Sequence, residues 1–233
     1  MASKVKAQPQ ENIKFELKSA RQREVFRAIK EKDVVLICGP SGSGKTLVSI
    51  WSGICLLNNV ESTIQRIVVA RLAADTCGED IGALPGNKQE KLLHLAGPVI
   101  DNMTQFMNHQ QAVGLFEQGI IEILPISHLR GRSFHNTFLI VEEIQNLDDT
   151  MVLTVLTRLS AGSKMVLNGD LNQVDIYGRR GVQVARQLLD GIPQAAVVEL
   201  DAADIYRHPF VRAVVERAAK LFHPSFSQPV KIG

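Results

Sequence analysis

Apolar residues gather in six short runs along the chain, separated by longer stretches of mixed character. The runs cover residues 34–38, 66–70, 120–126, 137–141, 163–167 and 195–200. Each run is mainly apolar and most are rich in Val, Ile and Leu, which is typical of strands buried on both faces of a parallel sheet. Segments with helical periodicity lie between the runs, including residues 19–30, 47–58, 148–159 and 178–189. This alternation predicts an α/β fold in which a mostly parallel sheet carries helices on both faces.

The remaining segments set the expected domain limits within the 233 residues. Residues 87–111 have apolar positions at helical spacing and predict one long helix, interrupted at Pro98. Residues 1–18 are polar and are expected to form a flexible arm, residues 19–222 a single domain, and residues 223–233 a tail.

A glycine-rich segment directly follows the first apolar run and precedes a helical segment. It reads Gly39, Pro40, Ser41, Gly42, Ser43, Gly44, Lys45 and Thr46. The pattern G-x-x-x-x-G-K-[ST] in this context predicts a loop whose backbone N–H groups wrap the phosphates of ATP. Lys45 is expected on the β- and γ-phosphates, and Thr46 on Mg²⁺. A glycine-rich turn that binds nothing seldom has both flanks of the right type.

Two carboxylates, Glu142 and Glu143, end the run at residues 137–141. A strand that delivers two acids at its carboxyl end suits the metal side of a nucleotide site. Glu142 is the expected metal-side group, and Glu143 is the expected base that orients and deprotonates water. A chance pair at a strand end is the alternative, and the phosphate loop upstream favours the functional interpretation.

Three further side chains are candidates for the same site. Gln22, in the first turn of the first helix, can pair with an adenine edge as donor and acceptor, or can be an ordinary surface glutamine. Gln173 follows Asp170 after the run at 163–167 and resembles a γ-phosphate sensor, with a capped loop as the alternative. Arg71 ends the run at 66–70, at the sheet edge where ligands bind in open α/β sheets.

The composition of the chain excludes some classes of protein but does not identify a binding partner. The formal net charge is +2, and three cysteines without C-x-x-C spacing indicate neither a disulfide framework nor a zinc site. The chain has no run of 18 apolar residues, so we expect no contact with a membrane and a cytoplasmic location. Aromatic residues make up 5% of the chain, which argues against extensive base stacking.

Together, these motifs resemble the PhoH family, whose ATP-binding domain is related to the first motor domain of superfamily 1 helicases. The matching segments are residues 39–46, 84–91, 129–132, 142–146, 169–175 and 204–209. The resemblance implies a RecA-like P-loop NTPase fold, Mg²⁺-dependent ATP hydrolysis, and a helicase-like or RNA-associated role. Two positions depart from the family pattern: Glu142 stands where the family commonly has Asp, and Leu72 follows Arg71 where the family often has Pro.

The resemblance also implies that the site is completed by a second domain, because related helicases close ATP between two such domains. This chain has room for one, so we expect a homo-oligomer, with a ring of six as the first guess, in which a neighbour supplies an arginine. Arg207 is the first candidate for this group. Behind it come Arg179, Arg180, Arg130 and Arg132.

Two other functions remain open at this point. One is a nucleotide-switched module that binds RNA or single-stranded DNA with little turnover, through backbone contacts by Lys88, Lys91, Arg130 and Arg132. The other is a small-molecule kinase, which ranks last because the sequence shows no acceptor-specific constellation.

Overall fold

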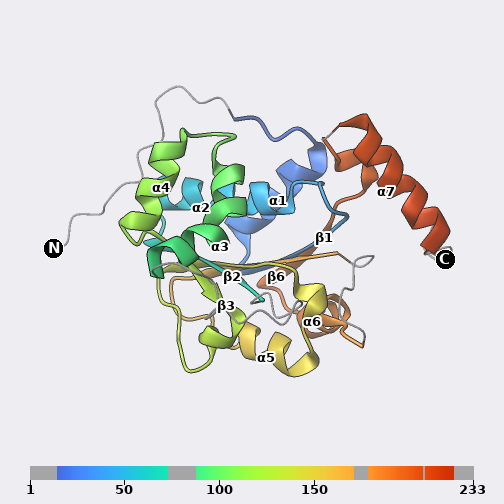
Figure 1. The fold of residues 1–233 in the computed structure, drawn as a ribbon. Helices are drawn as coiled ribbons and strands as arrows, with labels where there is room; N and C mark the ends of the chain where they lie inside the picture. Colours follow the sequence, from blue (N-terminus) through green and yellow to red (C-terminus); the bar gives the residue numbers. More distant parts are fainter. Residues whose placement is uncertain (1–14, 73–87, 171–177, 207, 223–233) are drawn as a thin grey trace.

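Six strands form one sheet in which every neighbouring pair is parallel, in the order β3-β2-β4-β5-β1-β6 (Figure 1). The structure, a computed structural model, describes residues 15–72, 88–170, 178–206 and 208–222. The strands are β1 (Val34–Cys38), β2 (Arg66–Arg71), β3 (Ile121–Pro125), β4 (Thr137–Val141), β5 (Lys164–Gly169) and β6 (Ala195–Glu199). All six fall on the predicted apolar runs, so the predicted parallel sheet is confirmed.

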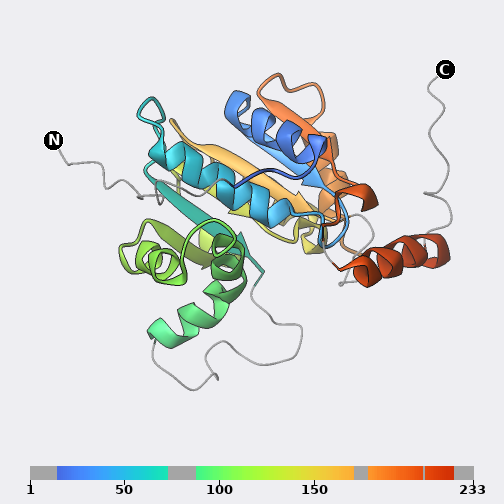
Figure 2. The ribbon, with the colours of Figure 1, turned by 90° about the horizontal axis from the view of Figure 1, so that it is seen from above.

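Helices cover both faces of the sheet (Figures 1 and 2). One face carries α1 (Ala20–Glu31), α2 (Lys45–Asn58), α3 (Lys88–Met103) and α4 (His109–Glu117), and the other carries α5 (Asp149–Leu156) and α6 (Gly181–Leu189). The short 3₁₀ helices are η3 (Ile126–Leu129), η4 (Ile144–Asn146) and η5 (Ala202–Asp204). Alternate residues of β1, β2, β4 and β5 enter opposite apolar clusters, as Val35 and Leu36 do, whereas Val197 of the edge strand β6 is 38% exposed. The apolar runs of the four central strands therefore reflect burial on both sides of the sheet.

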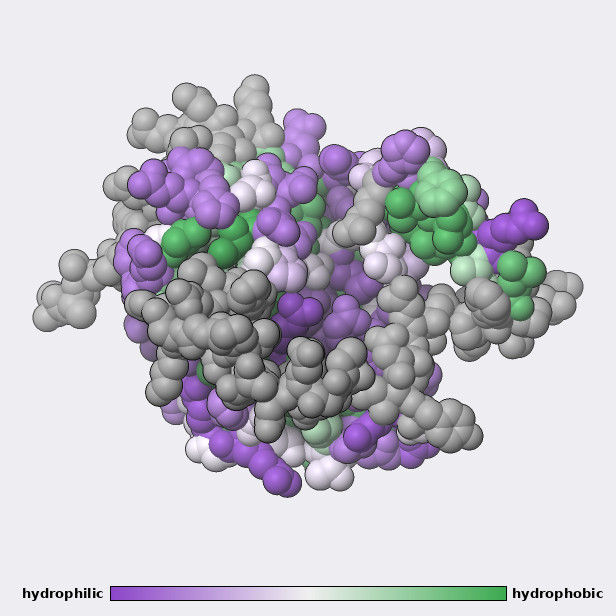
Figure 3. Space-filling model, viewed as in Figure 1, coloured by the Kyte–Doolittle hydropathy of each residue, from purple (hydrophilic) through white to green (hydrophobic). Residues whose placement is uncertain are grey.

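Helix α7 (Pro209–Phe222) lies to one side of these two layers (Figures 1 and 2). It carries an apolar surface, seen at the right of Figure 3. Phe210 is 69% exposed, Val214 48% and Leu221 63%. An amphipathic helix normally buries such a face, so the described part of the chain leaves this one without a covering layer.

The segment 15–18, predicted to belong to the flexible arm, packs on the domain, whereas residues 1–14 lie outside the described residues. The Phe15 ring contacts Trp51 and Phe106, with ring centroids 4.9 and 5.5 Å away. Ser19 then caps α1, because its hydroxyl accepts a hydrogen bond from the Gln22 N–H at 3.0 Å. An apolar anchor and a helix cap together hold residues 15–19 on the domain.

The prediction of one helix over residues 87–111 broken at Pro98 is wrong in its break point. Helix α3 runs through Pro98 to Met103, and α4 begins at His109. Gly97 precedes the proline, and without a Cβ it avoids the clash that usually excludes helical backbone there. The new start is set by a capping box in which Asn108 and Gln111 satisfy each other's backbone N–H groups.

Gly53 tests how tightly α2 packs on the sheet. A Cβ at this position would lie 2.7 Å from Phe138 Cδ1 and 2.9 Å from Ile67 Cδ1. We therefore expect Gly53→Ala to destabilise the protein by about 1–3 kcal/mol, although alanine is the better helix former. Thermal unfolding should show a lower Tm.

Gly114 in α4 provides the matched control. A Cβ there would meet only Gln118 Nε2, at 3.6 Å, so Gly114→Ala should stabilise the protein by about 0.5–1 kcal/mol. Equal shifts in Tm for the two variants would show that the contact of α2 with β4 is looser than described.

Candidate functional site

The carboxyl ends of the parallel strands meet at one edge of the sheet, and a cavity of about 310 Å³ opens there. Its lining includes Lys45, Thr46, Arg71, Glu142, Glu143 and Asp170. These residues follow or end four different strands, so the sheet gathers groups that lie far apart in the sequence. This is the edge at which open α/β sheets bind ligands.

The glycines of the phosphate-loop segment have two different structural roles. Gly42 and Gly44 have φ of 84° and 89°, a left-handed conformation that glycine adopts without strain. Gly39 is needed for a close approach instead, since a Cβ there would lie 2.8 Å from Leu200 Cβ. Gly39 therefore makes room for the chain after β6.

Lys45 points back into the loop that precedes it. Its ammonium donates hydrogen bonds to the carbonyl oxygens of Gly39 (2.6 Å) and Pro40 (3.0 Å). Burial lowers the pKa of Lys45, and the nearby carboxylates of Asp170 and Glu143 oppose that shift. The ammonium is thus held in the loop where the sequence predicts the phosphates, and a bound anion would stabilise its charged form.

Thr46 and Glu142 meet across the gap between α2 and β4. The Thr46 hydroxyl donates to Glu142 Oε2 at 3.0 Å, and the Glu142 side chain is buried. Two adjacent ligands of an octahedral Mg²⁺ ion lie about 3 Å apart, and Mg²⁺ prefers oxygen ligands. The pair therefore fits the metal-side role predicted for it, with the longer acid reaching the hydroxyl directly.

Asn168, a residue that sequence reasoning missed, holds the other oxygen of this carboxylate. Its Nδ2 donates to Glu142 Oε1 at 2.9 Å, and its amide also exchanges hydrogen bonds with the Ser49 hydroxyl. Burial raises the pKa of Glu142, while the hydrogen bonds from Asn168 and Thr46 counteract part of that rise. The sequence did contain one signal for this role, because Asn168 is a polar residue at the end of an apolar strand.

Glu143, the predicted base, lines the same cavity and has a left-handed backbone, with φ of 56°. Gln145, a second missed residue, donates from its amide to the Glu143 carboxylate and accepts the Asp170 N–H at 3.0 Å. Gln145 is buried and joins the ends of β4 and β5. Its place three residues after Glu142 was visible in the sequence, but its role depends on which strands are neighbours.

Gln22 also lines the cavity, but both ends of its amide already have partners. Nε2 donates to the Ser43 carbonyl at 3.0 Å, and Oε1 accepts the Lys18 N–H at 2.9 Å. The side chain thus ties the start of α1 to the phosphate loop. Pairing with an adenine edge stays a prediction, and it would require these two hydrogen bonds to be exchanged.

Two predicted site residues, Gln173 and Arg207, lie outside the described residues. Two of the arginines ranked behind Arg207 make ion pairs within the chain: Arg179 with Asp148, and Arg180 with Asp149 at 2.7 Å. The hydrogen bond from Arg180 lowers the pKa of Asp149. These arginines would have to leave carboxylates of their own subunit before they could reach a neighbour.

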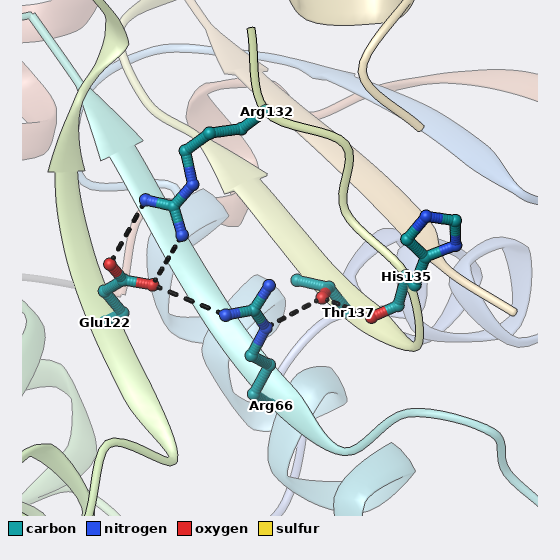
Figure 4. Close-up of polar contacts among 5 residues, drawn as sticks. All are labelled: Arg66, Glu122, Arg132, His135 and Thr137. Carbon is teal, nitrogen blue, oxygen red and sulfur yellow. Dashed lines mark hydrogen bonds and ion pairs between the residues drawn. The ribbon is translucent and has the colours of Figure 1, made fainter. Parts of the chain in front are cut away.

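Arg132 is held away from the cavity, beside the edge strand β3 (Figure 4). It donates two hydrogen bonds of 3.3 Å to Glu122, which also pairs with Arg66 at 3.7 Å. Both guanidinium groups lie over the Phe134 ring. The basic turn at residues 130–132 is therefore partly neutralised, while Arg130 is exposed.

The all-parallel sheet, the phosphate loop after β1 and the carboxylates after β4 define a P-loop NTPase fold of the RecA-like type. The sequence profile described as PhoH-like protein matches residues 14–219, and the chain belongs to this family.

Related proteins are longer than this chain. It is 39% identical over 202 residues to a PhoH-like protein of Synechocystis sp., an alignment that covers 85% of this chain and 60% of the relative. It is 36% identical over 202 residues to one of Bacillus subtilis, covering 86% and 62%. Among solved structures, the Pif1 helicase from Candida albicans aligns at 14% identity with a TM-score of 0.44, covering 93% of this chain and 49% of that one. Within the described ranges, the structure has no helix with the length and apolar character to cross a membrane.

The raised pKa of the buried Glu142 carboxyl predicts the direction in which protein stability changes with pH. Because its pKa is raised in the folded protein, the wild type loses stability as pH rises above the ordinary carboxyl value of about 4.3. We expect Glu142→Gln, which can keep both hydrogen bonds, to raise Tm in the absence of ligands. The gain should be smallest at acid pH and grow as pH rises through the raised pKa of Glu142, at about 2–4 °C per kcal/mol of relieved cost.

Differential scanning calorimetry between pH 5 and 8 would measure this effect. Glu24→Gln, on the exposed face of α1, is the control for a change in net charge. A Tm for Glu142→Gln below that of wild type across the whole pH range would contradict the inference that the buried charge of Glu142 destabilises the folded protein.

Proposed function

We propose that the protein is an Mg²⁺-dependent ATPase whose active site is the cavity at the carboxyl edge of the sheet. The observation that carries the proposal is the meeting of Thr46 and Glu142 at 3.0 Å beside Lys45. An ammonium, a hydroxyl and a buried carboxylate lie together there, and this is the set of groups that a triphosphate and its metal ion would need. The family membership supports the same conclusion.

In this proposal each residue has one task. The loop 39–46 wraps the phosphates with backbone N–H groups, and Lys45 leaves the carbonyls of Gly39 and Pro40 to neutralise phosphate charge. Thr46 and Glu142 would hold Mg²⁺, which would supply positive charge to neutralise the phosphates. Glu143 accepts the proton of the attacking water, and Gln145 fixes its orientation. Gln173 senses the γ-phosphate.

We further propose that the active unit is a homo-oligomer acting with RNA or single-stranded DNA in a helicase-like role. The exposed apolar face of α7 supports assembly, because monomers seldom leave such a face uncovered. Arg207 comes two residues before α7 begins at Pro209. Packing of α7 on a neighbouring copy would therefore bring this arginine close to the neighbour, where it can act on ATP in trans.

Phosphate release tests the catalytic assignment. We expect Lys45→Ala to abolish hydrolysis, and Glu143→Gln to lower kcat by about 10²–10⁴ while ATP still binds, because only proton transfer is removed. Specific activity should rise with protein concentration and again with RNA. Nucleotide binding without turnover in the wild type would instead favour a nucleotide-switched nucleic-acid-binding module.

Subunit mixing tests the arginine in trans. Neither Lys45→Ala nor Arg207→Ala should be active alone, but an equal mixture should recover activity at about a quarter of the interfaces. There, the loop of one variant meets the intact arginine of the other. A mixture of Lys45→Ala with Glu143→Gln is the control, since both changes damage the same subunit's site. No recovery in the first mixture would refute the role of Arg207.

A further inference from the structure

Arg71 is the one arginine among the described residues that line the cavity. It is half-buried at the end of β2, and within the described ranges its guanidinium makes no hydrogen bond or ion pair. Other arginines of the domain, such as Arg132 and Arg180, are held by carboxylates. A partly desolvated cation without a partner costs free energy, so its position calls for a ligand.

The sheet places Arg71 beside the metal-side carboxylate. The Glu142 N–H donates to the Ala70 carbonyl at 2.8 Å, which sets the end of β2 next to the end of β4. Neighbouring strands lie about 4.8 Å apart, so a guanidinium reaches easily from one strand end to the other. Arg71 also shares a sheet face with Val69, which lines the cavity and faces the side of the sheet where α2 carries Thr46.

The charges at this end of the cavity favour an anion near Arg71. Glu142, Glu143 and Asp170 line the cavity. The Lys45 ammonium donates to the carbonyl oxygens of Gly39 and Pro40. Even when Lys45 turns to the phosphates, a terminal phosphate close to Thr46 would lie among these three carboxylates, and a further cation would stabilise it. A guanidinium offers a fork of N–H donors that matches phosphate oxygens.

We propose that Arg71 contacts the γ-phosphate of a nucleoside triphosphate bound in the same subunit, so that the site distinguishes ATP from ADP before any neighbour takes part. This inference rests on the proposed function of the cavity. It assigns ground-state recognition to Arg71 in cis and leaves the transition state to the arginine in trans.

Calorimetric titration separates the two nucleotides. The full chain is titrated with ADP and with a methylene-bridged ATP analogue that is not hydrolysed, both with Mg²⁺. We expect Arg71→Gln to weaken binding of the ATP analogue about tenfold or more, and ADP by less than about twofold, as loss of a charge-assisted contact to one phosphate requires. Arg71→Lys keeps the charge but loses the fork of N–H donors. Its affinity for the ATP analogue should lie between those of the wild type and Arg71→Gln.

Arg27→Gln, on the exposed side of α1, is the control for net charge and should change neither affinity. An unchanged ratio of the two affinities in a folded Arg71→Gln variant would overturn this inference while leaving the proposed ATP site intact. The same unchanged ratio together with weaker binding of single-stranded RNA would assign Arg71 to nucleic acid and also overturn it. A wild type that binds neither nucleotide would refute the proposed function itself.

Discussion

The hydrogen bond between the Thr46 hydroxyl and the Glu142 carboxylate is the contact on which the rest of this site depends. It joins the first turn of α2 to the end of β4, two elements almost a hundred residues apart in the chain. It forms because parallel strands end at one edge of the sheet and because Asn168 fixes the second carboxylate oxygen. Without that support, a buried glutamate would have to find another partner or lose its charge.

The electrostatics of the cavity follow from this arrangement. Burial makes the charged forms of both Glu142 and Lys45 costly, and each is partly stabilised by groups of the opposite charge or by hydrogen bonds. A metal ion with a polyanion would supply the missing compensation for both groups at once. A matching ligand would therefore relieve the cost of these buried charges, which is a way to couple binding to local stability.

Sequence reasoning predicted the layers of the fold, the phosphate loop and the carboxylate pair, because continuous apolar runs and a fixed motif depend on local order alone. It missed Asn168 and Gln145, whose roles arise only when β4 and β5 lie side by side. It also placed a helix break at Pro98, because the effect of a preceding glycine on a proline is weaker as a signal than the proline itself. The double use of the Gln22 amide could not be predicted either, since it depends on the path of the loop 39–46.

The reach of Asn168 has a consequence for comparing this chain with its relatives. An aspartate at position 142 would be shorter by one methylene group, and the oxygen that Asn168 now holds at 2.9 Å would withdraw from it. The buried amide would then have lost its acceptor, which is unfavourable in a dry interior. The length of the acid at position 142 and the identity of the side chain at position 168 therefore depend on each other. Chains that carry the shorter acid are expected to differ at the second position as well, so the two sites should covary across the family.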